Sequence, residues 1–210
     1  MKSKSLFTIM LLAIFSFGAF AQGERTNTLS VDTENSSIKW VGKKVTGAHE
    51  GGIDISEGSL IFDDEKIVGG SFAIDMTSIT VTDIEKESAN AKLVGHLKSD
   101  DFFSTDKFKS ANMTIKTITE TGRVKGSEKA KLTINYEVVG TFTIKGISQD
   151  ITFPVTVSYF GAAGLRADAD ITIDRTLFDI HYGADKSLGD RMIYKNFDLK
   201  VSLAASFSGR

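Results

Sequence analysis

Three histidines, His49, His96 and His181, are the residues of this chain whose type first suggests chemistry. Three imidazoles form an open metal site in many proteins, and ligands on one element usually recur at spacings such as i and i+4. No such spacing joins these three, so the sequence predicts no metal site. His96 instead suits the end of a helix, and His49 lies in a glycine-rich segment that is typical of a hairpin.

The sequence carries none of the common catalytic motifs. It contains no cysteine, and we find no Gly-x-Ser-x-Gly elbow, phosphate-binding loop or dinucleotide fingerprint in it. The paired carboxylates Asp63–Asp64 and Asp100–Asp101 are more typical of turns and helix ends than of an acid–base pair. We therefore predict that the protein is not an enzyme.

Arg175 is the polar residue best suited to binding a ligand. It follows Asp174 and precedes an aromatic-rich segment, so its guanidinium could meet the head group of an anionic lipid. An internal ion pair is the other interpretation, because a partly buried arginine needs a carboxylate. The carboxylates considered for that pair are Asp100, Asp101 and Asp190.

Most of the chain alternates between apolar and polar residues with the period of two that is typical of β-strands. Leu132, Ile134 and Tyr136 alternate with Thr133 and Asn135, and about eight or nine segments follow the same pattern. One apolar and one polar face predict an antiparallel sheet, and closing it into a barrel hides its edges. The lone proline, Pro154, falls on the outward parity of its segment, which suits an edge or bulge.

Two segments depart from the alternation. Residues 85–99 have a helical pattern, in which Leu93, Val94 and Leu97 share a face. Residues 1–21 combine Lys2 and Lys4 with an apolar run and a small-residue end, as in a cleaved signal peptide. We therefore expect residues 22–210 to form one domain that is periplasmic or secreted. The net charge of −2 offers no general attraction for nucleic acid.

Four blocks resemble the YceI-like family of lipocalin-like, polyisoprenoid-binding proteins. They are Trp40-Val-Gly-Lys43 with the glycines that follow, Gly95-His-Leu-Lys-Ser-Asp-Asp-Phe-Phe103, Gly140-Thr-Phe-Thr-Ile-Lys-Gly146 and Asp174-Arg-Thr-Leu-Phe-Asp-Ile-His-Tyr-Gly183. Phe142 and His181 depart from the family pattern, and residues 120–131 match none of it. The resemblance implies an all-β, eight-stranded antiparallel barrel with a short helical segment, whose bore accepts an isoprenoid or fatty-acid-like tail.

We predict the ligand-binding residues from the apolar faces and from the resembling blocks. They are Trp40, Phe72, Ile74, Met76, Leu97, Phe103, Ile134, Tyr136, Phe142, Phe153, Val155, Arg175, Phe178, Tyr182 and Phe197. In a small barrel such side chains either enclose one ligand or simply fill the interior. Trp40 and Tyr182, each apolar with a polar tip, suit either the opening or the core.

The sequence thus predicts an exported, soluble barrel that binds or carries an amphiphilic lipid: an isoprenoid quinone, a polyprenol or a fatty-acid derivative. No cofactor other than such a lipid, no nucleic acid and no membrane span is expected, and a homodimer is left open. One alternative is a small outer-membrane barrel, which would turn its apolar face outward. Another is an isomerase or cyclase acting on a lipid in the same cavity, which would need a titratable group there.

Overall fold

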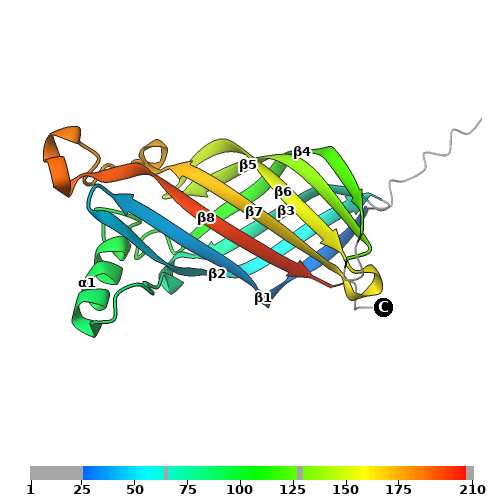
Figure 1. Ribbon diagram of the computed structural model, residues 1–210, viewed down its shortest axis with the longest axis horizontal. Helices are drawn as coiled ribbons and strands as arrows, with labels where there is room; N and C mark the ends of the chain where they lie inside the picture. Colours follow the sequence, from blue (N-terminus) through cyan, green and yellow to red (C-terminus); the bar gives the residue numbers. More distant parts are fainter. Residues whose placement is uncertain (1–25, 64–65, 127–129, 207–210) are drawn as a thin grey trace, which may run out of the picture.

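The structure is an eight-stranded antiparallel barrel, as the sequence predicts (Figure 1). A computed structural model describes residues 26–63, 66–126 and 130–206; the predicted signal peptide, residues 1–21, lies outside this part of the chain. Each strand pairs with the next, and β8 closes the barrel on β1. The strands are β1 (Thr26–Lys44), β2 (Gly47–Asp63), β3 (Lys66–Asp75), β4 (Ser110–Lys125), β5 (Leu132–Ile144), β6 (Ile147–Tyr159), β7 (Leu165–Asp174) and β8 (Ile193–Ala205).

Short helices occupy the connections between strands. The helix expected over residues 85–99 is α1 (Glu87–Lys98), and its last turn ends where Ser99 donates its backbone N–H and its hydroxyl to the carbonyl of His96. The described residues also form the 3₁₀ helices η1 (Met76–Ser78), η2 (Gly161–Ala163), η3 (Arg175–Phe178) and η4 (Lys186–Arg191). In Figure 1, α1 and the η4 segment extend from the same end of the barrel, on opposite sides of it.

The alternating pattern places apolar side chains inside and polar ones outside. In β5, Tyr136 and Val138 are buried while Glu137 between them is exposed, and Val138 pairs with the buried Phe153 of β6. The outer face carries ion pairs that cross neighbouring strands, such as Lys43 with Asp198 at 2.7 Å. This polarity is the opposite of that of an outer-membrane barrel. No helix among the described residues is long and apolar enough to cross a membrane.

The ladder between β6 and β7 is short, and a loop fills the gap that it leaves. Only Thr156–Tyr159 of β6 pair with β7, so Pro154 has a partner in β5 alone, in keeping with its predicted edge position. Beyond that ladder, η3 lies against β6 and β8. Phe178 and Ile180 are 0% and 1% exposed there, so the connection after β7 forms part of the barrel wall.

The interior is packed at one end and hollow at the other. The packed end contains buried side chains that do not line the cavity described below, such as Phe62, Ile134, Tyr136 and Leu165. The hollow end is the one at which α1 and η4 lie. At that end, β3 stops at Asp75 and the chain after it no longer belongs to the sheet. The segment around Thr80 nevertheless runs beside β2, where the Thr80 N–H donates to the Gly52 carbonyl at 3.0 Å.

Candidate functional site

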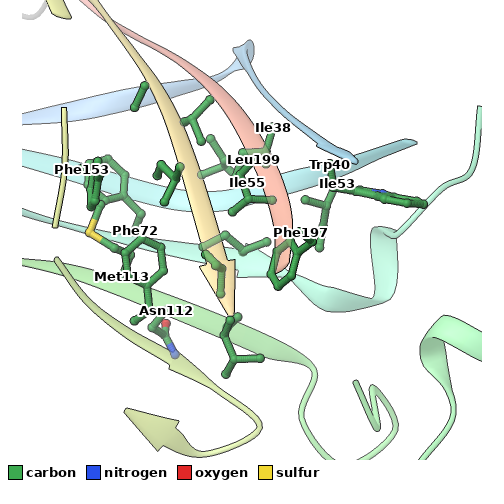
Figure 2. Close-up of a pocket in the computed structure, with 18 of the residues that line it drawn as sticks. Ile38, Trp40, Ile53, Ile55, Phe72, Asn112, Met113, Phe153, Phe197 and Leu199 are labelled. Atoms are coloured by element: carbon green, nitrogen blue, oxygen red, sulfur yellow. The ribbon is translucent and has the colours of Figure 1, made fainter. Parts of the chain in front are cut away.

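An apolar cavity of about 210 Å³ occupies the hollow end of the barrel (Figure 2). All eight strands contribute to its wall, and Leu97, Phe102 and Phe103 reach it from α1 and the loop after it. Phe153 and Met113 lie toward one side of the view in Figure 2, and Trp40 toward the other. The described residues that line the space expose only apolar atoms to it.

Aromatic side chains shape the cavity at both of its ends. Phe142 and Phe153 meet edge to face deep in the barrel, with ring centroids 5.8 Å apart. Gly140 leaves room for this approach: a Cβ there would lie 3.1 Å from Phe153 and 3.2 Å from Phe142, so the rings would have to shift by a few tenths of an ångström. Phe103 and Phe197 form a second edge-to-face pair, 6.5 Å apart, nearer the mouth. Such pairs hold their rings in place, so the wall keeps a defined shape.

Trp40 lies toward the mouth, by which we mean the side of the cavity near α1 and η4. The segment around Thr80, which runs beside β2 after β3 has ended, holds it there. Its indole N–H donates to the Thr80 carbonyl at 3.1 Å. The ring lies over Gly51, where a Cβ would stand 1.8 Å from the Thr80 carbonyl oxygen and 2.8 Å from the indole. Glycine is therefore required at position 51, where β1, β2 and the segment around Thr80 approach one another closely. Trp40 faces the cavity with its apolar body and satisfies its polar tip on the backbone.

Eleven of the fifteen predicted ligand-binding residues line this cavity. They are Trp40, Phe72, Ile74, Met76, Leu97, Phe103, Phe142, Phe153, Val155, Arg175 and Phe197. Their placement around one space is a fact of the structure, whereas their contact with a ligand stays a prediction.

The other four predicted residues lie elsewhere. Ile134 and Tyr136 are buried toward the packed end and have the inward parity; their β6 partners Val157 and Val155 line the cavity, but they themselves do not. Phe178 belongs to the wall segment between β6 and β8. Tyr182 is 48% exposed at the outside of the hollow end, where its ring contacts His96 and Phe102.

Several lining residues were missing from the predicted set. Ile38, Met113 and Leu199 have the inward parity of their strands, so the alternating pattern could have identified them. Ala167 and Ala169 also line the space, and their small size leaves room for a ligand. Phe102 stands beside the predicted Phe103 and also faces the cavity.

Arg175 is satisfied by the backbone of its own neighbourhood. It is 4% exposed, and its Nε, Nη1 and Nη2 donate to the carbonyls of Tyr194, Ile180 and Ile193 at 3.2, 2.8 and 3.0 Å. Burial lowers the pKa of the guanidinium, and the charge of Asp174 opposes that shift. Phe102 covers its face, with the ring centroid 5.7 Å from Cζ.

The predicted ion pair of Arg175 with Asp100, Asp101 or Asp190 is not formed. Among the described residues, no carboxylate forms an ion pair with it, and the neighbouring Asp174 bonds to Lys195 at 2.7 Å instead. Its polar atoms do not reach the cavity surface, although the residue lines the cavity. Arg175 thus links η3, to which it belongs, to the start of β8 through hydrogen bonds.

None of the three histidines belongs to the lining of the cavity. His49 Nδ1 lies 2.8 Å from Asp83 Oδ2, and His181 Nε2 lies 3.4 Å from Asp179 Oδ1. His96 packs its ring edge to face against Phe102, at 4.9 Å between centroids. Within the described ranges, no group of three histidine or carboxylate side chains could hold a metal ion.

Comparisons with known proteins agree with this architecture. The family model described as the YceI-like domain matches residues 29–205. Two curated relatives from Staphylococcus aureus, "UPF0312 protein SAB2563" (strain bovine RF122 / ET3-1) and "UPF0312 protein SA2479" (strain N315), are each 34% identical over 119 residues. Those matches cover 54% of this chain and 60% of each relative, so the chain spans less than two thirds of the relatives' length.

Two solved structures have the same fold. Burkholderia cenocepacia BcnA is 24% identical with a TM-score of 0.64, and the match covers 84% of this chain and 99% of BcnA. A polyisoprenoid binding domain from Saccharophagus degradans, described as implicated in plant cell wall breakdown, is 16% identical with a TM-score of 0.62, covering 84% and 97%. At these identities the likeness shows the fold alone. The family model, which spans most of the chain, shows that the protein belongs to the YceI-like family.

Proposed function

We propose that this protein binds and carries an amphiphilic lipid with one long tail, held in the apolar cavity at the hollow end of the barrel. The observation that carries the proposal is a cavity of about 210 Å³ whose described lining exposes only apolar atoms. The family relation and the polyisoprenoid binding domain with the same fold support this class of ligand. An isoprenoid quinone, a polyprenol or a fatty-acid derivative would meet these requirements.

The energy available from such a cavity is sufficient for tight binding. Each buried methylene contributes about 0.8 kcal/mol, so ten enclosed carbons supply roughly 8 kcal/mol before costs. Ordering the tail and losing its free motion consumes several kcal/mol of that. Micromolar binding requires about 8 kcal/mol net, so a tail with about fifteen enclosed carbons is needed.

We favour binding over catalysis because the cavity offers little to react with. Among its lining residues only Arg175 and Tyr194 are titratable, and the nitrogens of Arg175 already bond to carbonyls. A lipid isomerase or cyclase would need an acid or base against the substrate. No histidine or carboxylate of the described residues occupies such a position.

We further propose, from the predicted signal peptide over residues 1–21, that the protein acts in the periplasm or the medium. Fractionation of the host, followed by N-terminal sequencing of the recovered protein, tests that part of the proposal. We expect a mature chain that begins at Gln22. Recovery of the uncut chain from the cytoplasm would contradict it.

Native mass spectrometry of the protein, purified from its own host without detergent, tests the ligand. We expect a mass increment that matches one lipid per chain, and the same spectrum reports whether the protein is a homodimer. A protein that is empty after such purification, and that also fails to take up any added isoprenoid or fatty acid, would refute the proposed function.

A further inference from the structure

We infer that the site recognises the tail of its lipid alone and leaves the head group outside the barrel, so that lipids with different head groups bind alike. This inference rests on the proposed function and deepens it. Ligand sites usually contain a few polar groups that fix the orientation of the ligand. Here the described lining exposes no polar atom to the space, so nothing inside could hold a head group.

The buried guanidinium of Arg175 is the group that would ordinarily argue against this inference, because such a cation at a lipid site suggests a receptor for phosphate or carboxylate. Its three nitrogens already donate to carbonyls at 2.8 to 3.2 Å. Carbonyl oxygens carry partial negative charge, so the cation has electrostatic compensation without an anion.

Phe102 covers one face of the Arg175 guanidinium. Its ring lies 5.7 Å from Cζ and is 7% exposed. His96 and Tyr182 pack against the same ring at 4.9 and 5.5 Å between centroids. This aromatic group covers one face of the guanidinium, and the described lining exposes no polar atom to the space, so Arg175 offers no donor to a ligand there.

At the mouth, a head group can remain in contact with water, which the interior does not provide. Asn112, Asn196 and Tyr194 contribute to the lining from outward positions of β4 and β8, and all three are exposed to water, Tyr194 by 46%. A head group at this level remains in contact with water and loses little hydration. Drawing it inside would cost several kcal/mol, because no polar group would replace that water. The tail therefore supplies the affinity, whatever the chemistry of the head.

A matched pair of ligands tests the inference on the unaltered protein. Farnesol and farnesyl monophosphate share one tail and differ in charge, and geranyl monophosphate keeps the charge on a tail one isoprene unit shorter. Trp40, the only tryptophan of the chain, lines the cavity and reports binding by its fluorescence. The titrations are made below the concentrations at which the ligands form micelles.

We expect farnesol and farnesyl monophosphate to bind with Kd values within about threefold of each other, since the tail dominates. Geranyl monophosphate should bind at least tenfold more weakly. A preference of tenfold or more for farnesyl monophosphate over farnesol would overturn the inference and leave the proposed function standing. If no member of the series binds, the proposed function fails and the inference fails with it.

The position of the head group gives a second, independent readout. The phosphorus resonance of bound farnesyl monophosphate should be broadened by soluble Mn²⁺ nearly as strongly as that of the free ligand, because the phosphate lies in water. A phosphate shielded from Mn²⁺ while the ligand is bound would overturn the inference. Neither experiment requires a variant of Arg175.

Discussion

The two ends of this barrel are built from the same alternating strands and differ in what their inward side chains do. At the packed end, large residues such as Phe62, Tyr136 and Leu165 are buried in the core cluster and do not line the cavity. Along β7, by contrast, the inward positions after Leu165 are the small residues Ala167 and Ala169, which line the cavity. Alternation therefore creates an apolar interior, and side-chain volume along the barrel axis decides where that interior is open.

A charge placed in the hollow end should have the largest effect on binding. Phe153→Arg puts an unpaired guanidinium against the cavity, where the described lining is apolar. We expect lipid affinity to fall more than a hundredfold, measured by the fluorescence of Trp40. Thr152→Arg is the matched control, because the neighbouring Thr152 is exposed on the outer face. Unchanged uptake by a folded Phe153→Arg protein would show that the cavity is not the site.

A cavity created in the packed end should affect stability instead. Ile134 is 3% exposed, so Ile134→Ala should lower the free energy of unfolding by about 2–5 kcal/mol. Lipid affinity should remain within about twofold, because Ile134 does not line the cavity. Urea unfolding and ligand titration of the same preparation measure both quantities. A large loss of affinity with intact stability would mean that the two ends are not separate.

Filling the hollow end should convert it into a second packed end. Ala169→Phe adds a ring inside the cavity, and we expect affinity for a long-tailed lipid to fall at least tenfold. Stability should change little, since the new ring occupies existing space and overpacking alone costs about 1–3 kcal/mol. The free energy of unfolding and the Kd, compared with those of Ile134→Ala, measure the contrast. Undiminished binding would place the tail elsewhere.

The smallest effect concerns carboxylates on the outside of the barrel. Hydrogen bonds from Thr77 to Asp75, and from Lys43 to Asp198, hold the pKa of these carboxyl groups below the ordinary value. Because the folded-state pKa is the lower one, the stabilisation is present above the ordinary aspartate pKa, near 4, and is lost as the pH falls through the lowered pKa.

Unfolding measured between pH 6 and pH 2 should therefore show decreasing stability below about pH 4. Asp198→Asn should reduce the size of that decrease. A variant whose stability falls with pH as steeply as that of the original protein would contradict this assignment.

The fold was predictable because it depends on patterns that are local in sequence. The alternation identified the strands, and the spacing of Leu93, Val94 and Leu97 identified α1. The four blocks that resemble the family led to the right number of strands. Inward parity was equally predictable, since side chains on a strand must alternate between two faces.

Position along the barrel axis was not predictable in the same way. Tyr136 and Phe142 share one strand and one parity, yet Tyr136 is in the packed end and Phe142 lines the cavity. The stagger of neighbouring strands decides which part of each strand faces the cavity, and this stagger cannot be read from the alternation of one strand. The hydrogen-bond acceptors of Arg175 could not be predicted for a related reason. Two of the three carbonyls to which it donates belong to residues 18 and 19 positions further along the chain.

The central claim is that the tail of a lipid enters the hollow end while its head stays at the mouth, and quenching of Trp40 fluorescence by brominated lipids tests it most directly. Two sixteen-carbon fatty acids serve, one brominated beside the carboxylate and the other at the end of the tail. Trp40 lies toward the mouth, so the bromine beside the carboxylate should quench strongly and the terminal bromine weakly, with similar Kd values. Stronger quenching by the terminal bromine, or no saturable quenching by either lipid, would contradict the account.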